Sequence, residues 1–174
     1  MLRKDQIDFI DRVKKKPGIL NYLYGEITDY QQVIKLLGID KNSVVLDVGV
    51  GTGKFLTYLI MMAGCKGIGI EPVKSRYSKA VTLKERYKLG DRLELHQEHY
   101  PCEIKLKPTH VILHACAFTK NNAVDVYNAL PRGVKILHNS SHVQKYAHKG
   151  QNNKERINTT YLKNPGPHFW IHEK

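Results

Sequence analysis

Hydrophobic residues recur along this chain with two different spacings. Short runs rich in valine, isoleucine and leucine indicate buried strands, and apolar residues that return every three or four positions indicate amphipathic helices. In order, the pattern predicts a helix over 3–16, a helix over 30–37, a strand over 44–48, a helix over 53–63, a strand over 67–70, a helix over 73–87, strands over 93–96 and 111–115, a helix over 122–130 and a strand over 133–137.

The last part of the chain follows a different pattern. Residues 156–163 and 168–172 alternate between apolar and polar, as an antiparallel pair of strands would. Upstream, strands that alternate with helices indicate parallel pairing. The sequence therefore predicts an α/β fold with a mostly parallel twisted sheet, helices on both faces and an antiparallel C-terminal edge. We see no internal repeat or second domain and expect a single domain over 1–174.

The stretch VVLDVGVGTGKF at residues 44–55 joins a buried strand to a glycine-rich turn. The apolar run ends around Asp47, and Gly49, Gly51 and Gly53 follow at alternate positions before a helix begins. Glycine tolerates positive φ and lets the backbone approach a ligand closely. The new helix also offers free N–H groups to a negative group. This turn is therefore the first candidate ligand site.

The spacing of the glycines separates three nucleotide-binding motifs. A dinucleotide fingerprint, G-x-G-x-x-G, fails because Lys54 stands at its sixth position. A P-loop fails twice, because Val48 replaces its first glycine and Phe55 replaces its Ser or Thr. The form D-x-G-x-G-x-G resembles motif I of the Rossmann-like S-adenosylmethionine (SAM) methyltransferases. A structural turn that binds no ligand is the alternative.

An acid follows at the position where a βαβ unit holds a ribose. Glu71 ends the second predicted strand, KGIGIEP, about twenty residues after the glycines. A carboxylate there can accept hydrogen bonds from both ribose hydroxyls. The alternative is a solvated acid at the end of a strand. Beside the glycine turn, the ribose-binding interpretation is the stronger one.

Charge adds a second line of argument. The 174 residues carry 28 Lys and Arg against 16 Asp and Glu, a formal net charge of +12, with basic residues concentrated at 14–16, 74–88 and 145–156. Such an excess favours nucleic acid, chromatin or an acidic protein face as a partner, with plain solubility as the alternative.

No apolar run is long enough to cross a membrane, and the charged N-terminus lacks a secretory core. We expect an intracellular protein, in the cytoplasm or nucleus, that is not secreted.

Cysteine and histidine do not indicate a metal centre. Cys65, Cys102 and Cys116 form no C-x-x-C and suggest reduced thiols. Histidines lie four apart at 138 and 142 and again at 168 and 172, but no cysteine or acid joins them at ligand spacing. The sequence therefore predicts no metal.

Two further segments point to a family. Residues 24–26 read TyrGlyGlu and precede the glycine motif by about twenty residues, and VILHACAFTKNNAVDVYNAL reads as a strand, an Ala-Phe turn and a helix. Over roughly 21–174, this arrangement resembles the protein lysine methyltransferases typified by the disruptor-of-telomeric-silencing family of histone lysine methyltransferases. The resemblance implies a Rossmann-like, seven-stranded sheet, with 1–38 forming N-terminal helices and a cofactor-closing loop and 39–174 forming the catalytic core.

The resemblance also implies roles for individual residues. The cofactor-binding residues would be Tyr24, Glu26 and Thr28 (closing over the methionine end of SAM), Asp47, Gly49, Gly51 and Gly53 (the amino-acid end), Glu71 (the ribose), and Glu98 or His99 with Tyr100 (near the adenine). The lysine-channel candidates would be Phe118 in the Ala-Phe turn and the paired aromatics Phe169 and Trp170 of the last strand.

The chain departs from that family at several positions. His114-Ala115 replaces the family's Asn pair before the Ala-Phe turn, and Phe169 replaces an aromatic that carries a hydroxyl. The resemblance includes neither the family's large N-terminal helical portion nor its long basic tail. His114 at a strand mouth is a candidate acceptor of the departing proton, with a structural histidine as the alternative. The substrate need not be a nucleosome.

Three functions follow as hypotheses. The first is a SAM-dependent protein lysine N-methyltransferase that acts on a basic, chromatin-type or other protein with an accessible lysine. The second is a nucleic-acid (RNA or DNA) methyltransferase, which the charge favours. The sequence HACAF after the fourth strand, however, lacks the Asn/Asp-Pro-Pro-aromatic motif of amino-directed nucleic-acid enzymes. The third is a catalytically silent, nucleic-acid-binding relative.

Overall fold

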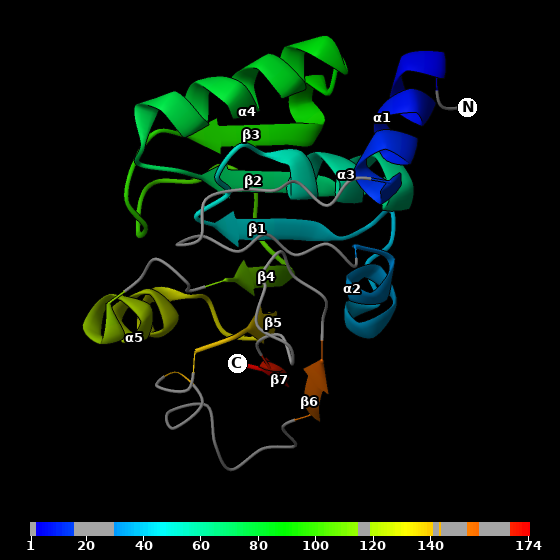
Figure 1. Ribbon diagram of the computed structural model, residues 1–174. Helices are drawn as coiled ribbons and strands as arrows, with labels where there is room; N and C mark the ends of the chain where they lie inside the picture. Colours follow the sequence, from blue (N-terminus) through cyan, green and yellow to red (C-terminus); the bar gives the residue numbers. More distant parts are fainter. Residues whose placement is uncertain (1–2, 16–29, 115–118, 141–142, 144–152, 157–167) are drawn as a thin grey trace.

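The computed structural model describes residues 3–15, 30–114, 119–140, 143, 153–156 and 168–174. Its elements form one layered arrangement around a central sheet (Figure 1). In chain order they are α1 (Lys4–Lys15), α2 (Tyr30–Leu37), β1 (Val44–Val48), α3 (Lys54–Ala63), β2 (Lys66–Ile70), α4 (Lys74–Arg86), the 3₁₀ helix η1 (Gly90–Arg92), β3 (Leu93–His96), β4 (His110–Leu113), α5 (Lys120–Ala129), β5 (Lys135–His138), β6 (Asn153–Arg156) and β7 (His168–Glu173).

The strands form one sheet in the order β3-β2-β1-β4-β5-β7-β6. Strands β1 to β5 pair in parallel, whereas β7 is antiparallel to both β5 and β6. The predicted α/β fold, with a mostly parallel sheet and an antiparallel C-terminal strand, is confirmed. The structure has β6 at Asn153–Arg156, which meets the first of the two predicted C-terminal strands, 156–163, only at Arg156. Residues 157–163 lie outside the described residues.

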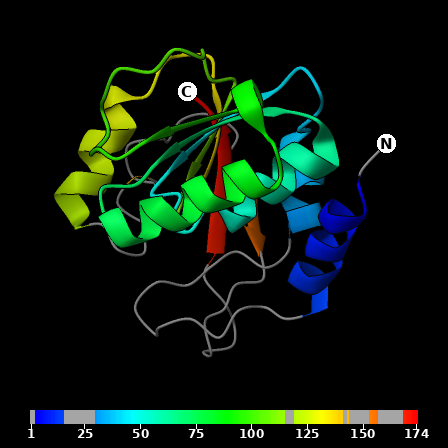
Figure 2. The same cartoon turned by 90° about the horizontal axis from the view of Figure 1, so that it is seen from above.

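Helices cover both faces of the sheet, as predicted. Successive strand residues point to opposite faces, so each strand contributes to two cores. One core contains side chains of α1 to α4 with Val45, Ile112 and Leu137. The other contains side chains of α5 with Leu46 and Val111. Figure 2 shows α5 across the strands from α4.

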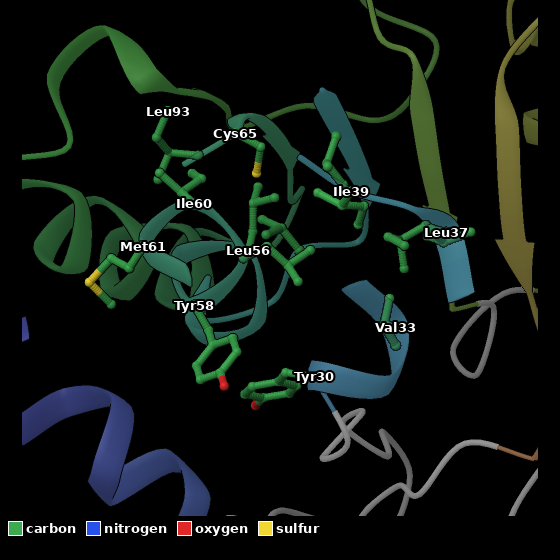
Figure 3. Packing of buried hydrophobic residues seen from close by; sticks show 14 of the residues in the cluster. Tyr30, Val33, Leu37, Ile39, Leu56, Tyr58, Ile60, Met61, Cys65 and Leu93 are labelled. Carbon is green, nitrogen blue, oxygen red and sulfur yellow. The ribbon is translucent and has the colours of Figure 1, made fainter. Parts of the chain in front are cut away.

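The first core is tight where α3 crosses β2. A Cβ added at Gly67 would lie 2.9 Å from side-chain atoms of both Leu56 and Ile60, so the glycine lets α3 sit directly on the strand. Farther out, the rings of Tyr30 and Tyr58 meet with centroids 4.8 Å apart, an aromatic pair that joins α2 to α3 (Figure 3). This packing holds the helix that follows the glycine turn.

An irregular segment, residues 100–108, joins β3 to β4 on the α5 face. The Glu94 carboxylate accepts hydrogen bonds from the backbone N–H groups of Lys105 at 2.8 Å and Leu106 at 3.1 Å. The Tyr100 hydroxyl donates to the backbone oxygen of Ala129 at 3.1 Å. Side chains thus satisfy backbone groups that a helix would otherwise satisfy internally.

Lys174, directly after β7, secures the end of α5. The ammonium of Lys174 donates to the backbone oxygens of Tyr127, Asn128 and Leu130, at 2.6, 2.8 and 2.6 Å. These carbonyls lie at the negative end of the helix, where a cation is favourable.

In the described part of the chain, Cys65 and Cys102 are free thiols, and no helix is long and apolar enough to span a bilayer.

Candidate functional site

The glycine turn lies at the carboxyl edge of the sheet, between β1 and α3. The N–H groups of Gly49 and Val50 donate to the Ile70 oxygen at 2.8 and 3.0 Å, which ties the turn to the end of β2. Gly49, Gly51 and Gly53 have φ of 87°, 59° and 76°. These left-handed conformations explain why glycine occupies alternate positions.

Gly51 and Gly53 are needed for different reasons. A Cβ at Gly53 would lie 2.9 Å from the Cβ of Ala80, so Gly53 lets α4 pack directly against the turn. A Cβ at Gly51 would meet only the Gly49 oxygen, at 4.0 Å. Gly51 therefore faces open space, into which a bulky side chain would project and which a ligand can fill. The contact with Ala80 is not visible in the sequence motif.

Glu71 joins the two halves of the site. Its Oε2 accepts a hydrogen bond from the Gly51 N–H at 2.9 Å, and its Oε1 accepts one from the Val73 N–H at 2.9 Å. The side chain is buried. A carboxylate has about four lone-pair sites, so each oxygen keeps capacity to accept from a hydroxyl group. Its position beside the turn fits the ribose-binding role predicted from the spacing.

Asp47 is a buried acid on the α3 face of β1. It lies opposite Gly69 of β2 and Ile112 of β4 and is 5% exposed. Burial, and secondarily the negative charge of Glu71, raises the pKa of Asp47 to about 7. Two acids that face little water favour a ligand with a positive charge or with hydrogen-bond donors. SAM offers both, as a sulfonium and an amino group, so the residues present fit this cofactor.

His114 lies beyond the end of β4, on the same face as Asp47. Its ring and that of Phe169 have centroids 5.3 Å apart. Burial lowers the pKa of His114 to about 4, so the imidazole is neutral at pH 7. Phe169 is fully buried in the first core. The structure thus brings His114 and Phe169 together.

Trp170 points to the opposite face, because it follows Phe169 directly along β7. Its ring stacks on His138 with centroids 5.5 Å apart, and His138 meets His172 edge-on at 5.1 Å. Phe169 and Trp170 therefore lie on opposite faces of the sheet, and their role as lysine-channel aromatics stays a prediction. Both ring nitrogens of His138 and of His172 are buried without a hydrogen-bond partner in the described part of the chain.

The residues expected near the adenine follow β3. The Glu71 N–H donates to the His96 oxygen at 3.0 Å, so the end of β3 lies beside the acid. Glu98 and His99 are exposed there. Tyr100 turns toward α5 and lines a surface cavity of about 440 Å³. Of the three, Glu98 and His99 are better placed to approach a ligand at the edge.

Other candidates lie outside the described residues, namely Tyr24, Glu26, Thr28 and Phe118. Among the residues that are described, no group of three or more His, Cys, Asp or Glu could hold a metal ion.

Comparison with known proteins supports the fold. No protein-family model and no curated protein matches this chain. An RNA methyltransferase from Salinibacter ruber, solved with S-adenosyl-L-homocysteine (SAH), aligns with TM-score 0.64 and 16% identity over 83% of this chain and 88% of that one. A tRNA (m1A58) methyltransferase from Aquifex aeolicus aligns with TM-score 0.61 and 15% identity, over 97% and 75%.

A third similar structure is that of a methyltransferase named for a precorrin and not for an RNA. The C-terminal domain of precorrin-6Y C5,15-methyltransferase from Rhodobacter capsulatus aligns with TM-score 0.61 and 17% identity, over 83% of this chain and 88% of that chain. At these identities the likeness establishes architecture alone. The chain therefore has the Rossmann-like fold of SAM-dependent methyltransferases.

Proposed function

We propose that this protein is a SAM-dependent methyltransferase. The observation that carries the proposal is the hydrogen bond from the Gly51 N–H to the Glu71 carboxylate, which joins the D-x-G-x-G-x-G turn to the acid at the end of β2. A structural turn would need neither a buried acid on each side nor the open space above Gly51. The SAH-bound neighbour with the same fold supports the same cofactor.

The residues of the site divide the work of holding SAM. SAM supplies a methyl group on a positively charged sulfur. We assign Glu71 to the ribose hydroxyls and Asp47 to the positively charged methionine end. The raised pKa of Asp47 falls when a cation arrives, because the charged carboxylate is then favoured. Binding is therefore coupled to the loss of a proton near neutral pH.

We propose a nucleic acid, and RNA first, as the substrate. Two similar structures are RNA or tRNA methyltransferases, and the net charge of +12 favours a polyanion. The protein-lysine hypothesis depends on Tyr24, Glu26 and Phe118, which lie outside the described residues. It also depends on Phe169 and Trp170, which lie on opposite faces of the sheet. The RNA hypothesis therefore has the better support.

His114 limits the chemistry of the substrate. A histidine whose pKa is lowered to about 4 is a weak base, although a neutral imidazole can still accept a hydrogen bond from a substrate N–H or O–H group. Methyl transfer is a single in-line displacement, so alignment is the main task, and alignment contributes about 7–11 kcal/mol in well-oriented reactions. We assign His114 to positioning the accepting group, with the buried ring of Phe169 packed against the imidazole to hold it in place.

Calorimetry with SAH tests the cofactor. The wild-type protein should bind SAH, and Gly51→Arg should abolish binding because the side chain enters the open space. Gly133→Arg is the matched control, since Gly133 also has positive φ, at 75°, and open space around it but precedes β5 at the other edge. Heat with NAD or ATP and none with SAH would overturn the proposal.

Methyl transfer from labelled SAM tests the substrate. The protein is incubated separately with total RNA, with DNA and with core histones. Label in RNA supports our proposal. Label in histones alone would establish the lysine hypothesis instead, and SAH binding without label in any arm would indicate a silent relative.

A further inference from the structure

The outer face of α4 is strongly basic. The helix KSRYSKAVTLKER contains five basic residues and one acid, Glu85. Lys74, Lys79 and Arg86 are exposed, and so is Lys88 just beyond the helix. Ser75 and Ser78 are exposed among them. The combination of cations and hydroxyl groups is the one that proteins use to contact phosphate oxygens.

Helix stability does not explain this pattern. The first turn of α4 holds Lys74 and Arg76 and no acid. A cation at a helix N-terminus is unfavourable, since the helix dipole is positive there. Among the described residues, Lys74 and Lys79 form no ion pair with an acid. The charge is therefore available to a partner.

The position of α4 connects this surface to the candidate site. The helix begins three residues after Glu71, and the contact between Gly53 and Ala80 holds it against the glycine turn. α4 forms the outer boundary of the molecule beside β3 (Figure 1). Its 13 residues extend about 20 Å, long enough to span several phosphates. A strand lying along α4 would reach the carboxyl edge of the sheet.

We infer that the outer face of α4 binds the phosphodiester backbone of single-stranded RNA and guides the strand to the carboxyl edge. The inference rests on the proposed function for its choice of RNA over other polyanions. Contacts from lysine and serine to phosphate oxygens carry no base information, so binding of the backbone along α4 is independent of sequence. Selection of the methylated nucleotide is left to the edge of the sheet.

A pair of double variants tests the inference. Lys74→Gln/Lys79→Gln removes two charges from α4. Lys105→Gln/Lys107→Gln removes two exposed charges from the irregular segment on the α5 face, so net charge changes equally. Binding of a fluorescein-labelled 20-nucleotide RNA of mixed sequence is measured by anisotropy over a series of salt concentrations.

The α4 variant should bind about tenfold more weakly at 0.15 M salt and should reduce the slope of log K against log salt by about 1.4, as expected for two lost phosphate contacts on a single strand. The control variant should change affinity less than about twofold. Equal losses in the two variants would overturn the inference, because attraction by net charge alone would then explain binding.

Two further measurements separate this inference from the proposed function. SAH calorimetry is performed on both variants, and both should bind SAH as the wild type does. If the wild type binds no SAH but the α4 variant still loses RNA affinity selectively, the inference stands and the proposed function fails. If polyglutamate displaces the RNA as well as unlabelled RNA does at equal charge, the surface binds acidic chains in general and the inference is overturned.

Discussion

The Glu71 carboxylate accepts the Gly51 N–H at 2.9 Å, so the end of β2 and the turn after β1 form one connected unit. The second carboxylate oxygen accepts the Val73 N–H, which attaches the start of α4 to the same unit. One acid thereby fixes three segments around the candidate site before any ligand arrives. Such preorganisation lowers the entropy cost of binding.

Glu71→Gln should weaken both the fold and the site. Glutamine has one oxygen that can accept a hydrogen bond and an NH2 group that cannot. Either the hydrogen bond from the Gly51 N–H or the one from the Val73 N–H is therefore lost. We expect a loss of about 1–3 kcal/mol in the free energy of unfolding, measured in urea. SAH affinity should fall at least tenfold. The exposed Glu98→Gln is the control for stability, and equal stability of the two variants would contradict this account.

Gly53→Ala should be more destabilising than Gly133→Ala. Both glycines have φ near 75°, so both variants incur the left-handed cost of about 1–2 kcal/mol. Only at Gly53 would the new methyl group also meet Ala80, at 2.9 Å. Urea unfolding of the two variants isolates the steric part of the cost, and equal losses would show that α4 can shift freely.

Asp47→Asn should stabilise the ligand-free protein above neutral pH. The folded pKa of Asp47, about 7, lies above its ordinary value of 3.8, so its contribution to stability is full below pH 3.8 and is lost as pH rises through 7. The advantage of the variant should grow from near zero at pH 4 to on the order of 4 kcal/mol at pH 8. Urea unfolding at both pH values measures it.

The same variant should bind SAH more weakly, because it lacks the carboxylate that we assign to the cationic end of the ligand. Greater stability with lost affinity would identify Asp47 as a residue kept for binding at the expense of stability. An Asp47→Asn protein that is less stable than the wild type at pH 8 would refute the argument.

His138→Phe should reduce the loss of unfolding free energy that occurs as the pH falls below 6.5. Burial first, and then the nearby His172, lowers the pKa of His138 to about 3, below its ordinary value of 6.5. The unfolded chain therefore gains a proton before the folded one does, and stability falls as pH drops from 6.5 toward 3. At pH 5 the loss from His138 is about 2 kcal/mol. Other buried histidines, such as His114, also contribute to the acid loss, so urea unfolding at pH 7 and 5 should show a loss that is about 2 kcal/mol smaller in His138→Phe than in the wild type and in the exposed control His99→Gln.

The elements could be predicted because local pattern and tertiary packing agree in this chain. The buried strand 44–48 and the helix over 30–37 have the predicted bounds. The pairing of Glu71 with the glycine turn followed from spacing, since βαβ geometry places the two side by side. Such relationships depend on a few adjacent elements.

Side-chain orientation was harder to predict. Adjacent residues on a strand face opposite ways, so the resemblance that matched Phe169 and Trp170 to the family's paired aromatics did not indicate which face of the sheet each ring occupies. Tyr100 could not be placed, because its hydroxyl is held by Ala129, a residue on an element that sequence spacing does not connect to it. Packing of Ala80 against Gly53 likewise depends on how two helices meet.

That last contact has an evolutionary consequence. A Cβ at position 53 would lie 2.9 Å from the Ala80 methyl group, and position 53 cannot become smaller than glycine, so a larger residue at 80 can be accommodated only by moving the backbone. Divergent homologues with a larger residue at 80 should therefore have a displaced α4 or a remodelled glycine turn. The distance between the outer face of α4, which we propose binds RNA, and the glycine turn would then vary among such homologues with the size of one side chain.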